Sequence, residues 1–194
     1  MRIIPVIVLS IVVGLVGLVG LVACGSHRQG QGNGNGDAGD CIGLACDVVN
    51  CQAIDQPETS ISGTVFAPNG TLPLYGINVY VPGSDPGPFA DGAQCAQCSA
   101  SLPGTPVVAA VSDATGHFLL AGVPSGDNIP LVITSGKWRR RLVIPHVEAC
   151  SAHTISPIDT TLPKDRTEGD MPRIAIPTGL ADSLECLVRK LGIA

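Results

Sequence analysis

Aromatic residues are scarce in this 194-residue chain, and basic residues are missing from more than half of it. Phe, Trp and Tyr make up 3% of the residues, so a core must be built from Val, Ile, Leu and Ala. Between Gln29 and Gly136 there are nine Asp and Glu residues and no Lys or Arg, which argues against nucleic acid as a partner. Because 24 glycines and 16 prolines interrupt the chain, the composition favours many short strands over long helices.

Sequence motifs for catalysis are also missing. The chain contains no His-x-x-Glu or His-Glu-x-x-His zinc motif, no Gly-x-Ser-x-Gly elbow and no P-loop. His146 and Glu148 form a His-x-Glu pattern whose side chains would lie on one face of a strand, as a surface pair. We therefore expect a protein that is not an enzyme and has no cofactor.

The first 24 residues have the layout of an export signal. A basic Arg2 is followed by the apolar stretch 3–23, which ends in Leu21-Val22-Ala23-Cys24. This ending resembles the lipobox of bacterial lipoproteins. The resemblance implies cleavage before Cys24, diacylglycerol on its sulfur and acylation of the new amino terminus, a dual anchor that holds stably in a membrane.

An uncleaved transmembrane helix is the alternative for this stretch, since about 20 apolar residues suffice to span a bilayer. Gly14, Gly17 and Gly20 weaken it as a helix, and no basic cluster follows it. Gly25, directly after Cys24, lacks the aspartate associated with inner-membrane retention in some bacteria. We therefore expect a lipid-anchored protein of the bacterial cell envelope, at the outer membrane or cell surface.

Composition divides the rest of the chain into segments. The Gly/Asn-rich stretch after Cys24 has no apolar side chain larger than alanine, so it cannot bury enough surface to fold. The predicted organisation is a signal peptide (1–23), a flexible tether (24–40), a Cys-rich segment (41–57), a β-sandwich (58–163) and a tail (164–194).

Alternating apolar residues and turn signals predict a β-sandwich or barrel. The pattern is clearest where Ile61, Gly63 and Val65 alternate with Ser and Thr, ahead of the turn signal Pro68-Asn69-Gly70. Asp85, Asp91 and Asp113 lack the spacing of a calcium loop and are expected to serve in turns. Strands are predicted at 59–66, 75–81, 106–112, 117–123, 129–134, 137–144 and 153–162.

The predicted β region resembles the carboxypeptidase regulatory-like domain. The resemblance is carried by Ser60-x-x-Gly63-x-Val65, Pro68-Asn69-Gly70, Asp113-x-x-Gly116-x-Phe118 and Val123-Pro124-x-Gly126. It implies an all-β fold, a single seven-stranded Greek-key, prealbumin-like (transthyretin-like) sandwich without catalytic residues. Such a module would act in binding or scaffolding at the envelope, with an envelope protein or a glycan as its partner. The lipid would anchor the protein to the membrane. An accessory domain of a surface enzyme or uptake system is the alternative.

The whole layout is also similar to a group of bacterial surface lipoproteins of unknown function. The similarity rests on the segments 136–140 (GKWRR), 168–175 (EGDMPRIA) and 184–193 (LECLVRKLGI). In such proteins the tail leads into a larger C-terminal part, so this chain is expected to be a shortened member.

Seven cysteines remain if Cys24 carries lipid, and export makes disulfides the expected state of the others. Their odd number leaves at least one without an intramolecular partner. Cys41, Cys46 and Cys51 are separated from one another by four residues each. Three cysteines cannot all pair among themselves, so one of them must reach elsewhere or stay free. The disulfide candidates are Cys41, Cys46, Cys51, Cys95, Cys98, Cys150 and Cys186.

Two cysteine pairs allow a metal site as the alternative. Cys95-x2-Cys98 and Cys150-x2-His153 together supply the Cys₃His set of a closed structural zinc site. The competing interpretation is a disulfide that joins Cys95 or Cys98 to Cys150, and export favours it.

One predicted strand carries a cluster of basic residues. Lys137, Arg139 and Arg141 would lie on one face, with Trp138 and Arg140 on the other. This face could bind an acidic glycan, a lipid headgroup or a protein, and Trp138 could stack on a sugar. The interpretation we favour is an edge strand that charge protects from aggregation.

The tail predicts one short amphipathic helix. Asp182-x-x-Glu185 resembles a capping box, and Gly192 is a candidate C-cap. Leucines then recur at helical spacing, and we expect this face to pack on the sandwich. These leucines are Leu180, Leu184, Leu187 and Leu191.

Overall fold

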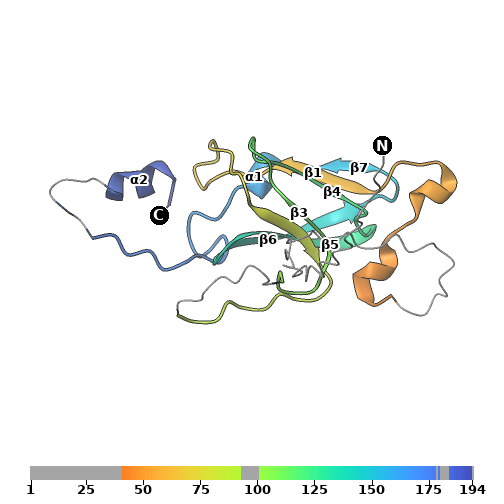
Figure 1. Cartoon of the computed structure of the whole chain (residues 1–194), viewed down its shortest axis with the longest axis horizontal. Helices are drawn as coiled ribbons and strands as arrows, with labels where there is room; N and C mark the ends of the chain where they lie inside the picture. Colours follow the sequence, from red (N-terminus) through yellow and green to blue (C-terminus); the bar gives the residue numbers. More distant parts are fainter. Residues whose placement is uncertain (1–40, 93–100, 178, 180–183, 194) are drawn as a thin grey trace, which may run out of the picture. The chain divides into compact units, whose positions relative to one another are not determined.

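Seven strands in two sheets form a β-sandwich in the computed structural model, which describes residues 41–92, 101–177, 179 and 184–193 (Figure 1). One sheet has the order β4-β1-β7 and the other β3-β2-β5-β6. This confirms the predicted seven-stranded β-sandwich. The strands are β1 (Ser60–Thr64), β2 (Asn78–Pro82), β3 (Pro106–Val111), β4 (His117–Ala121), β5 (Gly126–Ser135), β6 (Trp138–Val147) and β7 (Ala152–Thr154).

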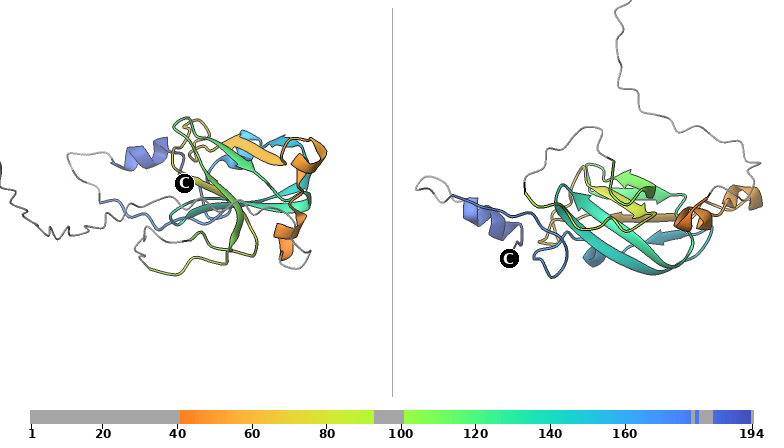
Figure 2. Two further views of the ribbon diagram at one scale, coloured as in Figure 1. Left: turned by 45° about the vertical axis from the view of Figure 1, so that its right-hand side comes forward. Right: turned by 90° about the horizontal axis from the view of Figure 1, so that it is seen from below.

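Four short helices accompany the strands in the described part of the chain. Two 3₁₀ turns, η1 (Gly43–Asp47) and η2 (Cys51–Ile54), precede β1, while α1 (Pro157–Thr160) and α2 (Leu184–Lys190) follow β7. Figure 2 shows the two 3₁₀ turns at the opposite end of the sandwich from α2. Among the described residues, no helix is both long and apolar enough to cross a membrane.

Strand β1 lies at the centre of the smaller sheet, antiparallel to β4 and parallel to β7. Its predicted alternation is confirmed, because Ile61 and Val65 are fully buried while Ser62 and Thr64 between them are partly exposed. Gly63 is also buried, and a Cβ there would lie 3.0 Å from the Phe118 ring. The small residue therefore lets Phe118 fill the core across the strand.

Branched aliphatic side chains from both sheets make the core, as the scarcity of aromatics predicts. Ile61 and Leu120 come from the smaller sheet. Val79 and Val81 of β2, with Leu131 of β5, face them from the larger sheet. All five are 0% exposed.

Two predicted turns form through side-chain caps. Asn69 Oδ1 accepts hydrogen bonds from the backbone N–H groups of Thr71 and Leu72, each at 3.1 Å. Asp113 Oδ1 accepts from the N–H groups of Thr115 (2.8 Å) and His117 (3.0 Å). These bonds, with that from the Thr115 hydroxyl as the largest cause, hold the pKa of Asp113 below its usual value. Both residues act as turn formers, as predicted.

The seventh strand is shorter than predicted. Instead of running from 153 to 162, it ends at Thr154, and α1 begins at Pro157. Proline fits the first turn of a helix but not a paired strand, which explains the interruption. The Thr160 hydroxyl then donates to Thr64 O at 2.6 Å, and the chain rejoins the sheet as an isolated bridge between Phe66 and Thr161.

The predicted packing of the tail helix is wrong. Helix α2 buries no residue, and Leu184 and Leu187 are 46% and 53% exposed. The helix instead meets the sandwich at its end, where Asn69 Nδ2 donates to Lys190 O at 3.1 Å. Gly192 is the C-cap as predicted, with φ +78° and its N–H on Arg189 O. Leu180 and Asp182 of the predicted pattern lie outside the described residues.

Candidate functional site

Two disulfides organise the Cys-rich segment. Cys41 pairs with Cys46 inside the segment, and Cys51 pairs with Cys150, 99 residues further along the chain. Cys51 therefore reaches elsewhere, which is one of the two outcomes that the spacing left open. Cys186 is exposed and has no disulfide partner among the described residues.

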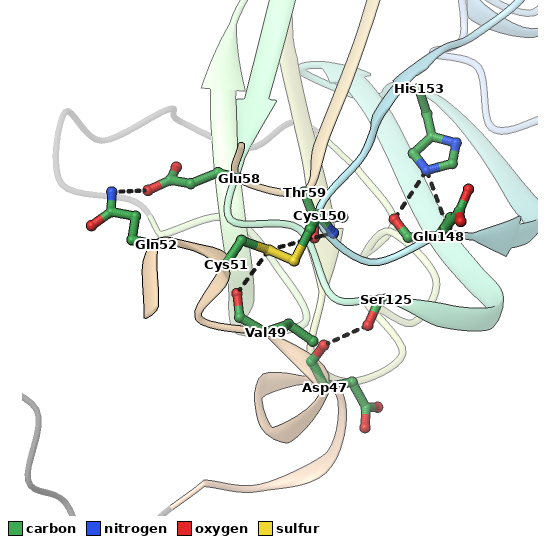
Figure 3. Close-up of a disulfide and its surroundings, with 10 residues drawn as sticks. All are labelled: Asp47, Val49, Cys51, Gln52, Glu58, Thr59, Ser125, Glu148, Cys150 and His153. Carbon is green, nitrogen blue, oxygen red and sulfur yellow. Dashed lines mark hydrogen bonds between the residues drawn. A yellow bond between two sulfur atoms is a disulfide. The ribbon is translucent and has the colours of Figure 1, made fainter. Parts of the chain in front are cut away.

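The Cys51–Cys150 disulfide lies where the segment meets the end of the sandwich (Figure 3). Thr59, just before β1, accepts a hydrogen bond from the Cys150 N–H through its hydroxyl at 2.8 Å. Asp47 O accepts from both the N–H and the hydroxyl of Ser125, at 3.0 and 3.2 Å. The disulfide thus fastens the segment to the loop before β7, and the Asp47 bonds fasten it to the loop before β5.

The predicted zinc site is not formed in this arrangement. The Cys150 sulfur is bonded to Cys51, so it is not a thiolate ligand, nor is it joined to Cys95 or Cys98. His153 Nε2 accepts a hydrogen bond from the Glu148 N–H at 3.0 Å. Cys95 and Cys98 lie outside the described residues, and the part of the chain that is described has no cluster of three metal-ligating side chains.

The predicted surface pair of His146 and Glu148 takes a different form. His146 Nδ1 lies 2.6 Å from Asp127 Oδ1, across the β5–β6 pairing. Both side chains are more than half exposed. Strand alternation predicted that His146 would pair with Glu148. His146 instead contacts Asp127, its neighbour on the adjacent strand.

The alternating cations Lys137, just before β6, and Arg139 and Arg141, within it, point at one loop. We call residues 83–92 the cover loop, because they lie along the outer face of the larger sheet (Figure 1). Lys137 Nζ donates to the carbonyls of Ala90, at 2.7 Å, and Gly92. Arg141 Nη1 lies 3.6 Å from Asp85 Oδ1 in an exposed ion pair. The outer cations of the series therefore fasten the two ends of the cover loop.

Arg139, between them, lies in the interior. Its side chain is 1% exposed, pairs with Asp170 Oδ2 at 2.7 Å and donates to Gly87 O at 2.7 Å. Its guanidinium lies 4.1 Å from the centroid of the Phe89 ring. The prediction of an exposed binding residue is therefore wrong at Arg139, because the tail and the cover loop enclose it.

The opposite face of β6 holds the segment directly before the tail. Trp138 Nε1 donates to Pro163 O at 2.8 Å, and Arg140 Nη1 donates to Thr161 O at 2.5 Å. Trp138 also packs against the hydrophobic core. Its indole N–H is therefore occupied and part of its ring packs on the core, which gives Trp138 a structural role in this arrangement.

Strand β6 is an edge strand, as the favoured interpretation required. Part of its edge is protected by backbone pairing as well as by charge, because the N–H and C=O of Arg139 both bond to Asp170 at 2.9 Å. Gly169 makes this approach possible, since a Cβ there would lie 2.5 Å from Arg139 O.

Two buried polar atoms on the face beneath the cover loop have no hydrogen-bond partner among the described residues. They are Tyr80 Oη and Arg139 Nη1. Burial raises the pKa of Tyr80 above its usual value, and the positive charges of Arg139 and Arg141 oppose that shift.

We expect Tyr80→Phe to raise the free energy of unfolding by about 1 kcal/mol, because it removes a buried hydroxyl without a partner and keeps the ring. Urea unfolding followed by Trp138 fluorescence would measure this, since the chain has one tryptophan. Tyr75→Phe, at an exposed position, is the matched control and should change nothing. A loss of stability in Tyr80→Phe would contradict the prediction.

An apolar groove of about 530 Å³ opens beside the cover loop. Leu44 of η1 and Pro86 of the cover loop line one side, and Arg141 to Val143 of β6 line the other. The ion pair of Asp85 and Arg141 lies at the groove. Val143 is 58% exposed, so the groove continues onto the open edge of the sheet.

Sequence reasoning missed this groove. Its walls come from four separate segments, and only Pro82, Pro86 and Pro130, each near apolar residues, offered a signal. The Cys51–Cys150 disulfide helps to bring Leu44 to the groove, since it attaches the segment to the sandwich, while Cys41–Cys46 closes the loop that contains η1.

Comparison with known proteins adds little to this geometry. No family model and no curated protein matches the chain. It is similar to chains in two crystal structures of a type II cohesin–X-dockerin complex from Acetivibrio cellulolyticus, an N-terminal and a C-terminal interface mutant. The identities are 19% and 18% and the TM-scores 0.30 and 0.29, over 50% of this chain and 51% of each matched chain.

This chain spans about half the length of the solved chains that it matches. The TM-scores are too low for a shared function or a shared partner to follow from the likeness. The resemblance to the carboxypeptidase regulatory-like domain therefore stays a prediction that rests on the sequence.

Proposed function

We propose that this protein is a lipid-anchored protein of the bacterial cell envelope whose β-sandwich is a non-catalytic binding or scaffolding module. Cys24 would carry the anchor, and residues 25–40 would be the tether. The partner would be an envelope protein or a glycan, and the module would be of the carboxypeptidase regulatory-like type.

The observation that carries the proposal is the Cys51–Cys150 disulfide. It joins residues 99 positions apart and its Cys51 end is 1% exposed, so it is part of the folded core. Structural disulfides form and persist in oxidising compartments outside the cytosol. This agrees with the export signal that precedes Cys24.

The groove supports a binding role. It is concave and largely apolar, it lies next to an ion pair, and it is open to partners along the edge of β6. The polar residues nearby are occupied in holding the cover loop, as at Lys137 and Arg139. We therefore assign the groove to recognition of a partner and assign no reaction to it.

Intact mass of the detergent-extracted protein tests the anchor. We expect a mass for residues 24–194 plus acyl chains, lowered by two hydrogens for each disulfide. Cys24→Ala should lose the acyl mass and leave the membrane fraction. Cys186→Ala, which removes an exposed cysteine outside both disulfides, is the matched control and should keep the lipid.

Two results would contradict the proposal. An unprocessed chain that starts at Met1 would replace the lipid anchor with a membrane-spanning helix. A zinc-sized increment that is lost on acidification would overturn the expectation that there is no cofactor.

A further inference from the structure

We propose that the groove and the adjoining edge of β6 bind a short extended peptide of a partner protein. The peptide would add a strand beside Arg141–Val143 and place an apolar side chain in the groove. This inference rests on the proposed binding function and names the kind of partner that the site accepts.

The edge of β6 has free backbone groups at this position. Arg139 uses its outward N–H and C=O to pair with Asp170, and residues two apart in a strand have the same orientation. The backbone groups of Arg141 and Val143 therefore also face away from β5. Neither has a hydrogen-bond partner among the described residues on that side. An extended chain can pair with these groups, as Asp170 does at the neighbouring position.

The groove adjoins the same three residues. Arg141 to Val143 form one wall, and the opposite wall carries apolar side chains such as Leu44 and Pro86. In an added strand, alternate side chains point to the same face. A residue paired with Arg141 or Val143 would thus direct its side chain to the face where the groove lies. Main-chain bonds with a pocket for alternate side chains are the basis of recognition by strand addition.

The available length favours a short peptide over a second copy of this chain. Asp170 occupies the edge at Arg139, and Pro145 has no N–H to donate at the other end. An antiparallel β6 from a second molecule, centred on Leu142, would bring its Pro145 opposite Arg139 and meet the Gly169–Asp170 segment. A peptide that is extended over three or four residues fits between these limits.

The test uses the full lipidated protein in detergent and a displayed library of random dodecapeptides. We expect enriched peptides that share an apolar residue, and we expect the best of them to slow hydrogen exchange at the amides of Arg141 and Val143. The amide of Leu142, which faces β5, should exchange slowly with or without peptide. Enrichment of no peptide, or protection elsewhere on the surface, would overturn the inference.

Paired variants test the two parts of the site. Val143→Pro removes the outward N–H and should weaken binding about tenfold, the equivalent of about 1.4 kcal/mol, whereas Val143→Thr keeps the donor and should bind normally. Leu44→Asp puts a charge in the groove without touching the edge, and should also weaken binding at least tenfold. Ile42→Asp, at an 87% exposed position of the same segment, is its control.

Each alternative outcome is decisive. If Val143→Pro and Leu44→Asp both bind the peptide as tightly as the wild type, and their unfolding curves match that of the wild type, the inference is overturned. A dimer in mass photometry that Val143→Pro abolishes would also overturn it, because β6 would then pair with a second copy. Lipidation at Cys24 is read from the intact mass, so loss of the peptide site and loss of the anchor are separate results.

Discussion

Replacing both Cys51 and Cys150 with alanine is expected to lower the free energy of unfolding by about 4–5 kcal/mol. The disulfide closes a loop of about a hundred residues, and the chain-entropy contribution of such a loop is about 4.7 kcal/mol. Typical domains have a total stability of about 5–15 kcal/mol, so the variant should lose a large part of it. We expect a much lower midpoint in urea unfolding, which Trp138 fluorescence would measure.

The second disulfide provides the control. Cys41 and Cys46 are five positions apart, so their loop constrains the unfolded chain far less. Replacing both with alanine should cost less than half as much, and η1, which buries no residue, should be the only element affected. Equal losses in the two variants would contradict the argument from loop length.

Asp170→Ala is expected to lower the free energy of unfolding by about 3–5 kcal/mol. Its carboxylate is the anionic partner of Arg139, whose side chain is 1% exposed. Removing one partner of a buried pair leaves the other charge without compensation, which is more costly than losing the attraction itself. Arg139 Nη1 already has no hydrogen-bond partner among the described residues, so the guanidinium would keep only its contacts with Gly87 O and the Phe89 ring.

The two halves of this pair should respond unequally. Asp170 is 33% exposed, so water can reach its carboxylate when Arg139 is replaced with methionine, and that variant should lose only about 1–3 kcal/mol. Glu168→Ala, which breaks partly exposed pairs with Arg140 and Lys164, is a matched control. It should lower the free energy of unfolding by about 1 kcal/mol or less. A loss below 1 kcal/mol in Asp170→Ala would show that Arg139 is hydrated.

Local chemistry made part of this structure predictable. Alternation in β1, the turn at Asn69 and the C-cap at Gly192 depend on residues close in sequence, and the structure has all three. Turns at regular intervals and apolar alternation predicted short strands in a sandwich or barrel, because each strand needs a buried face, and the family resemblance implied the seven-stranded sandwich.

Long-range contacts made the rest unpredictable. Sequence alternation correctly put Arg139 on the same face as Lys137 and Arg141, but it could not show that the cover loop would close over that face. Burial of Arg139 depends on Asp170, which lies 31 residues away. Cys51 pairs with Cys150 because the loop before β7 lies beside it in the fold. The spacing of the cysteines along the chain does not determine the position of this loop.

The Cys51–Cys150 disulfide also has a mechanical consequence. A pull on the chain from its amino-terminal side meets Cys51 before it meets β1, and the covalent bond passes part of that load to Cys150, directly before β7. Because β1 and β7 are parallel neighbours, both are then pulled from the same end. The force is shared between two strands and cannot peel β1 from β7 one hydrogen bond at a time.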